Sequence, residues 1–334
     1  MPTGLWMQKN KSSQTPRPKV PRRAFDGVLL LDKPVGFSSN QALVQAKRLL
    51  LALKAGHTGT LDPFATGLLP LCFGEATKFS QDLLEADKTY DTTVHLGVRT
   101  DTGDTEGEVV ETLPVNATLE QIEAVLANFR GPISQIPPMY SALKRDGKPL
   151  YEYARAGVTL EREARQVVIH DLQLLGYEAP FLHLRVKCSK GTYIRVLGED
   201  IGAQLGCGAH LQALRRIQVG ELTLDGAVTL PEFEAMSMEQ REQALAPPDR
   251  LLSTFPAVAL PAELAQRFLH GQRIALGKHG LSGPIDGRVR VYDQRKQLLG
   301  SAQMQPGQLL APERLVKFAS PAAPDIQLDL TSTD

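Results

Sequence analysis

The sequence predicts an α+β fold built on a mixed, largely antiparallel sheet. Residues 88–98 and 181–188 alternate apolar and polar side chains, which is typical of half-buried strands. Residues 38–50 and 119–129 carry apolar side chains at helical spacing. The strands and helices follow no regular βαβ order, and no glycine fingerprint for dinucleotide binding is present. These observations favour α+β over a doubly wound parallel sheet.

The first predicted elements are a buried strand and a helix. The run GVLLLDKP, 27–34, is short, apolar and ended by a proline, which predicts a buried strand. Ser38 or Ser39 can cap the helix that follows. Its apolar stripe is formed by Ala42, Leu43, Ala46, Leu49 and Leu50. LLPLCFG, 68–74, predicts a second buried strand.

The alternating segments predict which side chains face inward. In 88–98 the predicted inner face holds Tyr90, Thr92, Val94, Leu96 and Val98. In 181–188 it holds Leu182, Leu184, Val186 and Cys188. We expect Thr192 to cap the next helix, and its apolar positions are Ile194, Leu197, Ile201 and Leu205.

The remaining segments predict a second, smaller domain and two tails. Residues 25–250 form the expected main domain, in which 231–250 looks like a connecting segment. Residues 288–304 read as a hairpin within a small β-rich domain over 253–319. We expect disorder at both ends, over the basic 1–24 and the acidic 320–334. A solvated tail is favoured over a polyanion-binding one for 1–24.

Composition restricts the function classes. The 334 residues suffice for about two domains of ~150 residues. No long apolar run and no apolar signal segment occur, so a cytoplasmic location is expected. The odd, widely spaced cysteines indicate reduced, buried thiols, namely Cys72, Cys188 and Cys207. Histidine and cysteine spacings match no metal site, so no metal is expected. The net charge of zero is uninformative about nucleic acid.

Asp62 is the first candidate for chemistry. It lies in GHTGTLDPFATG, where no Lys or Arg stands nearby, and an apolar strand follows directly. An Asp before Pro is a frequent turn former, which is the structural alternative. Two features favour a reactive role: the glycines permit close approach of a ligand, and the edge of a core is a place where a carboxyl pKa can be tuned.

Arg195 is the second candidate. A helix capped at Thr192 would hold Arg195 in its first turn, where the helix dipole disfavours a cation by about 0.3–1 kcal/mol. A negative partner is therefore expected, either a phosphate, a catalytic carboxylate, or Glu199 one turn later. The chain shows no nucleophile elbow, Walker loop or paired carboxylates at Asp62. A single Asp acting as nucleophile or base remains.

A basic and aromatic segment occupies 131–165. Six Lys and Arg residues follow Pro137-Pro138 and interleave with three tyrosines. Such interleaving can serve a nucleic-acid surface. Four acidic residues lie in the same segment, so composition alone favours a solvated arm.

Long motifs resemble the bacterial TruB family of tRNA pseudouridine synthases. They are DKPVGFSSN, GHTGTLDPFATGLLPL, GEATKF, KTYDTTVHLGVRTDTGDTEG, IPPMYSALKRDGKPLYEYARAG and CSKGTYIRVLGEDIGAQLGCGAHLQALRR. They run in consistent order from Gly27 to Arg216. FLHGQRI through LLAPERLVKF is similar to the family's PUA-like RNA-binding domain. Residues 1–24 and 320–334 lie outside the resemblance.

The resemblance implies isomerisation of uridine-55 in the T loop of tRNA to pseudouridine, without cofactor or metal. The uracil is detached through N1 and rejoined through C5. Asp62 matches the catalytic aspartate, which would attack the sugar, attack the base or abstract a sugar proton. The 131–165 segment becomes a thumb-like RNA contact by analogy.

Other residues match by position in the family's motifs. Arg195 matches the arginine that pairs with the catalytic Asp, and His57 a histidine that helps hold the splayed T loop. Tyr90 matches the tyrosine stacked on the target base. Tyr193 and Leu214 match a substrate-contacting tyrosine and a pocket-wall residue. Without the resemblance, Tyr90 and Leu214 would read as core and His57 as a loop residue.

Two main functional hypotheses follow, and a weaker third is a pseudouridine synthase with another RNA target. The first is a tRNA uridine isomerase that uses one aspartate on a flipped-out base. The rival is a non-catalytic module that binds or folds tRNA. The sequence shows no obvious apolar interface, so a monomer is expected.

Overall fold

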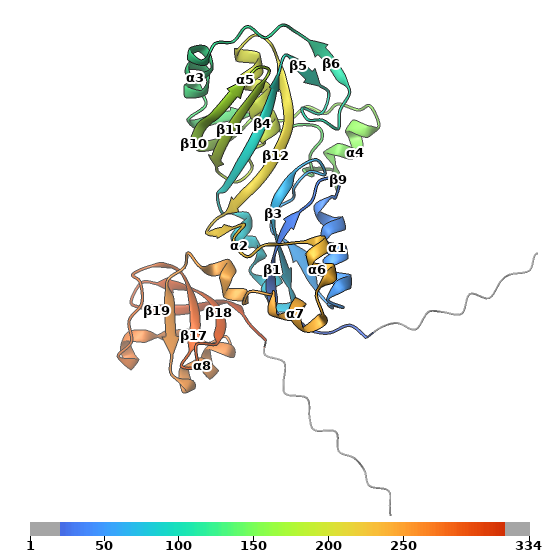
Figure 1. Ribbon diagram of the computed structural model, residues 1–334. Coiled ribbons are helices and arrows are strands. Elements are labelled where there is room, and N and C mark those ends of the chain that lie inside the picture. The colour runs from blue at the N-terminus through green and yellow to red at the C-terminus, as the bar shows by residue number, and fades with distance from the viewer. Residues whose placement is uncertain (1–20, 318–334) are drawn as a thin grey trace, which may run out of the picture.

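A computed structural model describes residues 21–317, which form two main sheets and two short hairpins (Figure 1). The larger sheet has ten strands and the smaller has five. This arrangement confirms the predicted α+β class, with a mixed main sheet and a β-rich C-terminal unit. Disorder is predicted for 1–24 and 320–334. Of these, 1–20 and 320–334 lie outside the described residues.

The larger sheet is mixed but mainly antiparallel. Its strands run in the spatial order β14 (Val228–Thr229), β1 (Gly27–Lys33), β3 (Thr66–Phe73), β12 (Ala209–Val219), β4 (Lys88–Leu96), β11 (Phe181–Cys188), β10 (Arg165–Glu178) and β7 (Gly131–Gln135). β2 (Ala55–His57) pairs with β3, and β13 (Leu222–Thr223) with β12. Only the β1–β14 and β3–β12 pairs are parallel within this sheet. Chain segments distant in sequence therefore meet at β3, β12 and β4.

Helices cover the larger sheet where the sequence predicts them. α1 (Ser39–Leu49) begins after Ser38, which forms a capping box with Gln41. α3 (Leu119–Asn128) is capped in the same way by Thr118. α5 (Ile194–Gln204) packs against β12. The predicted inner residues of β11 (Leu182, Leu184, Val186 and Cys188) are all at most 1% exposed, which confirms the predicted alternation.

Two local predictions are wrong. Thr192 does not cap α5: the N-cap residue is Tyr193, and the Thr192 hydroxyl donates to the Ser189 carbonyl at 2.9 Å instead. The segment 231–250 is not a plain connection. It forms α6 (Leu230–Ala235) and α7 (Met238–Gln243), and Phe233 is fully buried against the core. Its two capping boxes, at Thr229 and Ser237, are the local signals for these helices.

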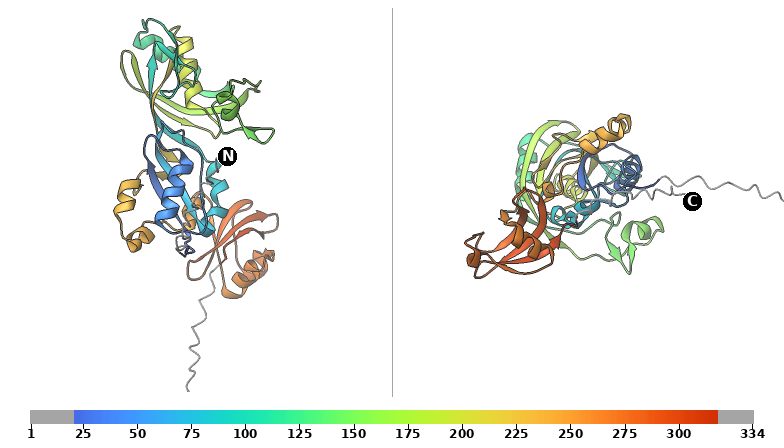
Figure 2. Two further views of the ribbon diagram at one scale, coloured as in Figure 1. Left: turned by 90° about the vertical axis from the view of Figure 1, so that its right-hand side faces the viewer. Right: turned by 90° about the horizontal axis from the view of Figure 1, so that it is seen from below.

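Shorter elements connect the main strands. They are the 3-10 turn η1 (Gly74–Lys78), α2 (Ser80–Leu84), the hairpins β5 (Val98–Thr100) with β6 (Val109–Thr112) and β8 (Lys144–Arg145) with β9 (Lys148–Pro149), α4 (Leu150–Arg155) and η2 (Pro248–Leu252). The segment that holds β8, β9 and α4 projects to the same side of the molecule as the smaller sheet (Figure 2).

The smaller sheet has its own core. Its order is β15 (Ala257–Leu260), β17 (Gly287–Asp293), β18 (Leu298–Gln305), β19 (Leu309–Leu315) and β16 (Ile274–Ala275), with α8 (Ala262–Leu269) packed on it and η3 (Leu276–His279) after β16. β17 and β18 form the hairpin predicted over 288–304. Phe268 of α8 is fully buried in this core.

A shared apolar cluster joins the two sheets. Phe79 and Leu251 pack there with Leu298 of β18. The Tyr292 hydroxyl donates to Asp249 at 2.6 Å, and Arg288 bridges Asp82 and Glu313. Apolar packing and buried polar contacts together hold the smaller sheet against η1 and α2.

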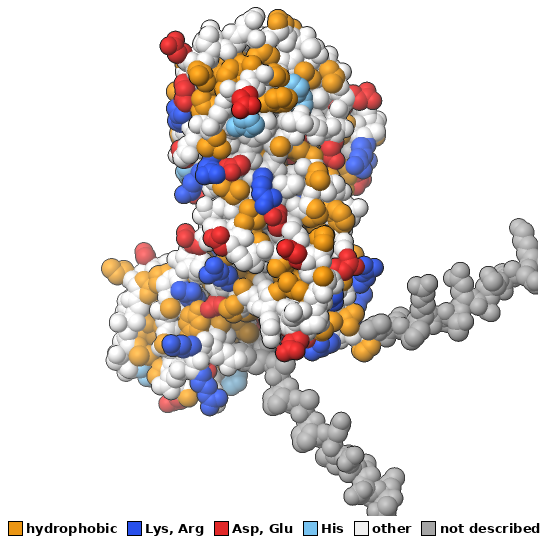
Figure 3. Space-filling view, viewed as in Figure 1, with side chains coloured by type: hydrophobic (Ala, Val, Ile, Leu, Met, Phe, Trp, Pro, Cys, Tyr) orange, Lys and Arg blue, Asp and Glu red, His pale blue; other side chains and the backbone are white. Residues whose placement is uncertain are grey.

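The cysteines, the helix lengths, the potential metal ligands and the surface charges all bear on the predictions made from composition. All three cysteines are free and buried, as predicted. Within residues 21–317, no helix is long and apolar enough to cross a membrane, and no cluster of His, Cys, Asp or Glu there could hold a metal ion. Basic and acidic side chains are interspersed over the larger sheet, on the face shown in Figure 3.

Gly67 is the tightest point between β3 and β12. Its φ is +99°, and a Cβ there would lie 2.2 Å from the Arg216 carbonyl oxygen. We predict that Gly67→Ala lowers the free energy of unfolding by at least about 3 kcal/mol, because left-handed strain and overpacking add. Urea unfolding measures the loss.

Gly131→Ala is the matched control for this prediction. Gly131 has φ +95°, and a Cβ at this residue would meet no other atom within 4 Å. Its loss is therefore strain alone, about 1–2 kcal/mol. Equal losses for the two variants would show that the close approach of β3 and β12 contributes nothing.

Candidate active site

The loop that carries Asp62 is fixed by α1 and β1. The Ser39 hydroxyl accepts from the Leu61 amide at 2.7 Å and donates to the Leu61 carbonyl at 3.0 Å. Lys33, fully buried, donates from Nζ to the carbonyls of Phe37 at 2.6 Å and Pro63 at 3.4 Å. The residues on both sides of Asp62 are therefore held by side chains from other elements, which fixes the direction of its carboxylate.

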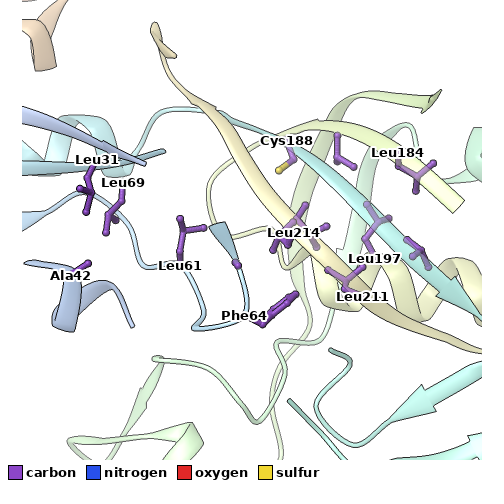
Figure 4. Packing of buried hydrophobic residues seen from close by; sticks show 14 of the residues in the cluster. Leu31, Ala42, Leu61, Phe64, Leu69, Leu184, Cys188, Leu197, Leu211 and Leu214 are labelled. Carbon is purple, nitrogen blue, oxygen red and sulfur yellow. The ribbon is translucent and has the colours of Figure 1, made fainter. Parts of the chain in front are cut away.

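Apolar side chains anchor the same loop from below. Leu61 and Phe64 are 3% and 7% exposed and belong to the main core with Leu214 of β12. Figure 4 shows Phe64 beside Leu211 and Leu214, with Leu61 between this group and Leu69. Leu214 is thus buried next to the loop, at the position where the resemblance expects a pocket wall.

Asp62 and Arg195 form an ion pair. Arg195 Nε lies 3.1 Å from Asp62 Oδ2. The Arg195 side chain is only 4% exposed, whereas the Asp62 side chain keeps 38% exposure. The arginine is therefore part of the protein interior, and the carboxylate faces outward from it. Such a carboxylate can meet a substrate while its partner stays fixed.

Arg195 has three further partners. Its Nη1 donates to the Thr102 carbonyl at 2.8 Å and its Nη2 to the Tyr140 carbonyl at 2.6 Å. Nη1 also lies 3.3 Å from Asp104 Oδ2. Two carboxylates thus offset the unfavourable position of this cation in the first turn of α5. The alternative partner considered from sequence, Glu199, forms no ion pair with Arg195 in the described residues.

Asp104 is a second buried carboxylate that sequence reasoning missed. Its side chain is 3% exposed, and it accepts from the Thr102 hydroxyl at 2.6 Å and the Glu106 amide at 3.0 Å. In the sequence it resembles Asp101, which lies three residues earlier and is exposed. Its contacts distinguish it from Asp101: the bridge to Leu211 of β12, the ion pair with Arg195 and the bond from Thr102.

Opposing effects set the pKa of Asp62. Burial raises it above the ordinary value, the charge of Arg195 lowers it, and the charge of Asp104 raises it. A nucleophile or base must be ionised to act. The pKa of Asp62 is raised overall, chiefly by burial, and the charge of Arg195 limits this rise and so favours the ionised form that the chemistry needs.

Two tyrosines lie close enough to Asp62 to respond to its charge. Burial raises the pKa of Tyr90 and of Tyr193, and the charge of Asp62 raises both further. Tyr193 is the N-cap residue of α5, and its amide donates to Gln135 Oε1 at 3.0 Å. Tyr90 lies on β4, directly opposite Arg216 of β12.

His57 lies on β2, which pairs with β3. Burial lowers the pKa of His57, and the charge of Arg216 lowers it further. Its buried Nδ1 has no hydrogen-bond partner. The structure thus places beside the loop an imidazole whose lowered pKa favours its neutral form. Lys33 and Arg216 are two more buried cations near this loop that sequence reasoning missed.

A cavity of about 1040 Å³ lies behind Arg195. It is lined in part by Thr102 and Tyr140, the residues whose carbonyls hold the guanidinium, and by Glu199. Asp62 does not line it. This cavity therefore adjoins the supporting side of the site rather than the exposed carboxylate.

Family models match nearly all of the described chain. The N-terminal domain of TruB family pseudouridylate synthase matches residues 47–194. A tRNA pseudouridylate synthase B C-terminal domain matches 195–256, and the C-terminal part of pseudouridine synthase II TruB matches 256–316.

Curated relatives match at high identity. The tRNA pseudouridine synthase B of Burkholderia mallei (strain ATCC 23344) is 63% identical over 306 residues, which cover 90% of this chain and 97% of the relative. That of Ralstonia nicotianae is 62% identical over 318 residues, which cover 93% and 99%.

Solved structures share the fold. The crystal structure of a Cbf5-Nop10-Gar1 complex contains a chain that is 26% identical, with a TM-score of 0.66 and coverage of 86% of this chain and 84% of that one. A structure of an H/ACA RNP bound to a substrate RNA containing 2'-deoxyuridine matches with the same TM-score at 24% identity, covering 86% and 84%. Sequence identity and fold agree, and the chain belongs to the TruB family of pseudouridine synthases.

Proposed function

We propose that this protein converts uridine-55 in the T loop of tRNA to pseudouridine, with Asp62 as the catalytic nucleophile or base. The observation that carries the proposal is the single outward-facing carboxylate held by a buried arginine. The tRNA substrate is supported by relatives whose names describe tRNA pseudouridine synthases. The T loop follows from the resemblance of the motifs around Asp62.

The reaction detaches uracil from its sugar at N1 and rejoins it at C5. A base inside a folded loop must first be extruded, at a cost of a few kcal/mol. We propose that Tyr90 stacks on the extruded base, which returns about 1–3 kcal/mol. Asp62 then meets the nucleotide, Arg195 keeps the carboxylate ionised and oriented, and Leu214 with Tyr193 forms the wall of the pocket.

Two projecting parts are proposed to hold the RNA. In the 131–165 segment, Lys148 lies over the Tyr153 ring at 4.7 Å and Arg155 over the Tyr151 ring at 5.4 Å. Residues 257–316, in the proposed PUA-like domain, carry eight Lys and Arg against four Asp and Glu. Because both parts project to one side (Figure 2), they can contact one RNA together, with His57 beside the splayed loop.

Asp62→Asn tests the central assignment. We predict that it lowers pseudouridine formation at least about a thousandfold, while the Kd for tRNA changes less than about tenfold because phosphate contacts dominate binding. Unmodified tRNA is incubated with each protein, and pseudouridine is mapped by carbodiimide treatment and primer extension.

Asp225→Asn makes the same change in an exposed loop and should retain full activity. Turnover by Asp62→Asn would contradict the role of Asp62. If wild type binds tRNA but forms no pseudouridine, the RNA-folding alternative gains support.

The pH dependence tests the carboxylate–arginine pair. Activity needs ionised Asp62, so the rate falls as the pH drops through the pKa of Asp62. Arg195→Met removes a charge that lowers this pKa, and the acid limb of the single-turnover rate should move to higher pH. Asp104→Asn removes a charge that raises it, and its acid limb should move to lower pH. Shifts of the same sign in both variants would contradict this account.

Substrate choice tests the T-arm proposal. A T-arm minihelix should be modified at a rate within about tenfold of whole tRNA, because the reactive loop and nearest phosphates are present. Anticodon and D stem-loops of equal length are the matched controls. Equal rates on all three hairpins would rule out recognition of the T loop.

A further inference from the structure

Arg216 is buried at the centre of the site. It is 1% exposed and is the bulkiest of the fully buried side chains among residues 21–317. On β12 it lies opposite Tyr90 of β4 and beside Gly67 of β3. In an antiparallel pair, directly opposed residues share a face of the sheet. Arg216 and Tyr90 therefore point to the same side, beneath the loop that carries Asp62.

The guanidinium of Arg216 binds carbonyls on both sides of Asp62. Nε donates to the Leu68 carbonyl at 2.8 Å, and Nη2 donates to the Gly59 carbonyl at 3.1 Å. No carboxylate forms an ion pair with it within residues 21–317. Its neighbour Arg215, on the other face of β12, pairs with Asp32 at 2.6 Å.

The presence of a buried arginine without a carboxylate partner must be explained. Desolvation of a buried ion costs several kcal/mol, and an apolar side chain of similar volume often gives equal or greater stability. Two carbonyls satisfy part of the guanidinium. Tyr90 lies directly opposite Arg216 on β4, and its phenol is close enough to raise the pKa of the guanidinium. An apolar side chain could fill this space equally well, so packing alone does not explain an arginine. A donor that orients the Tyr90 hydroxyl would explain it.

We propose that Arg216 is a positioning residue for Tyr90. Its guanidinium donates to the phenol oxygen, which fixes the ring against the extruded uracil and leaves the phenol proton directed toward the substrate. The same side chain holds Gly59 and Leu68, so Tyr90 and the Asp62 loop keep one relative position. This inference rests on the proposed function, in which Tyr90 contacts the target base.

The pKa shifts fit this arrangement. Burial raises the pKa of Tyr90, while the charge of Arg216 and its hydrogen bond lower it. Burial lowers the pKa of Arg216, and Tyr90 raises it. Each group thus favours the charged form of the other, as expected for a donor and acceptor in contact.

A double-mutant cycle tests the proposal. Arg216→Gln in the wild-type background should lower the single-turnover rate about a hundredfold, because misplaced contacts of about 1 Å cost that much. In the Tyr90→Phe background the same change should cost at least about tenfold less, because only the contacts with the Gly59 and Leu68 carbonyls remain to be lost. The Kd for tRNA should stay within about threefold in all four proteins.

Matched variants separate positioning from folding. Arg215→Gln makes the same change one residue away, on the face with Asp32, and should leave the rate within about twofold. Arg216→Lys keeps a positive charge. In the protein that retains Tyr90 it should be faster than Arg216→Gln, whereas in Tyr90→Phe the two substitutions should give similar rates. Equal losses for Arg216→Gln in both backgrounds would overturn the proposal, because Arg216 would then act independently of Tyr90.

A second measurement covers the case in which Arg216 variants do not fold. In ¹⁵N spectra, the slowly exchanging Nε signal of the buried Arg216 should shift in Tyr90→Phe, which retains the ring. An unchanged signal would overturn the contact. This outcome does not depend on catalysis, whereas a wild-type protein that forms no pseudouridine would instead overturn the proposed function.

Discussion

The structure depends on one buried cation shared by two carboxylates. Arg195 is 4% exposed and lies 3.1 Å from Asp62 and 3.3 Å from Asp104. Burying a guanidinium is costly, and nearby negative charge reduces that cost, while a partly buried carboxylate has a raised pKa unless a cation stands beside it. The carboxylates reduce the cost of burying the Arg195 guanidinium, and the guanidinium lowers the pKa of Asp62. Asp104 shares in neutralising the arginine, while Arg195 orients Asp62 and opposes the rise of its pKa without enclosing it fully.

The sheet order explains why these groups meet. Asp62 precedes β3, Tyr90 lies on β4, and Leu214 lies on β12, the strand that lies between β3 and β4 in the sheet. Arg195 arrives from α5, which packs on β12. The parallel β3–β12 contact, made possible by Gly67, therefore brings the loop to the other groups. The smaller sheet is attached at η1 and α2, directly after β3, so it is held close to the same strand.

Much of this could be predicted from sequence because the signals are local. The alternation in β11 and the cap at Ser38 each depend on a few adjacent residues. The predicted cap at Thr192 is wrong because Tyr193, with no capping side chain, begins α5 while Gln135 satisfies its amide from another strand. Asp104 and Asp101 look alike in sequence, and contacts with β12 and α5 bury one of them. Contacts between segments distant in sequence determine which residue caps α5 and which aspartate is buried, and a local sequence pattern does not show such contacts.

The two buried arginines, Arg195 and Arg216, have different electrostatic effects. Arg195 is compensated by carboxylates, so it acts on Asp62. Arg216 is bound by the carbonyls of Leu68 and Gly59 and adds positive potential beneath the loop, which also lowers the pKa of His57. A polyanionic substrate would enter toward a site with two buried arginines, in which the carboxylate of Asp62 is already paired. Repulsion between Asp62 and a phosphate is thereby reduced before the chemistry begins.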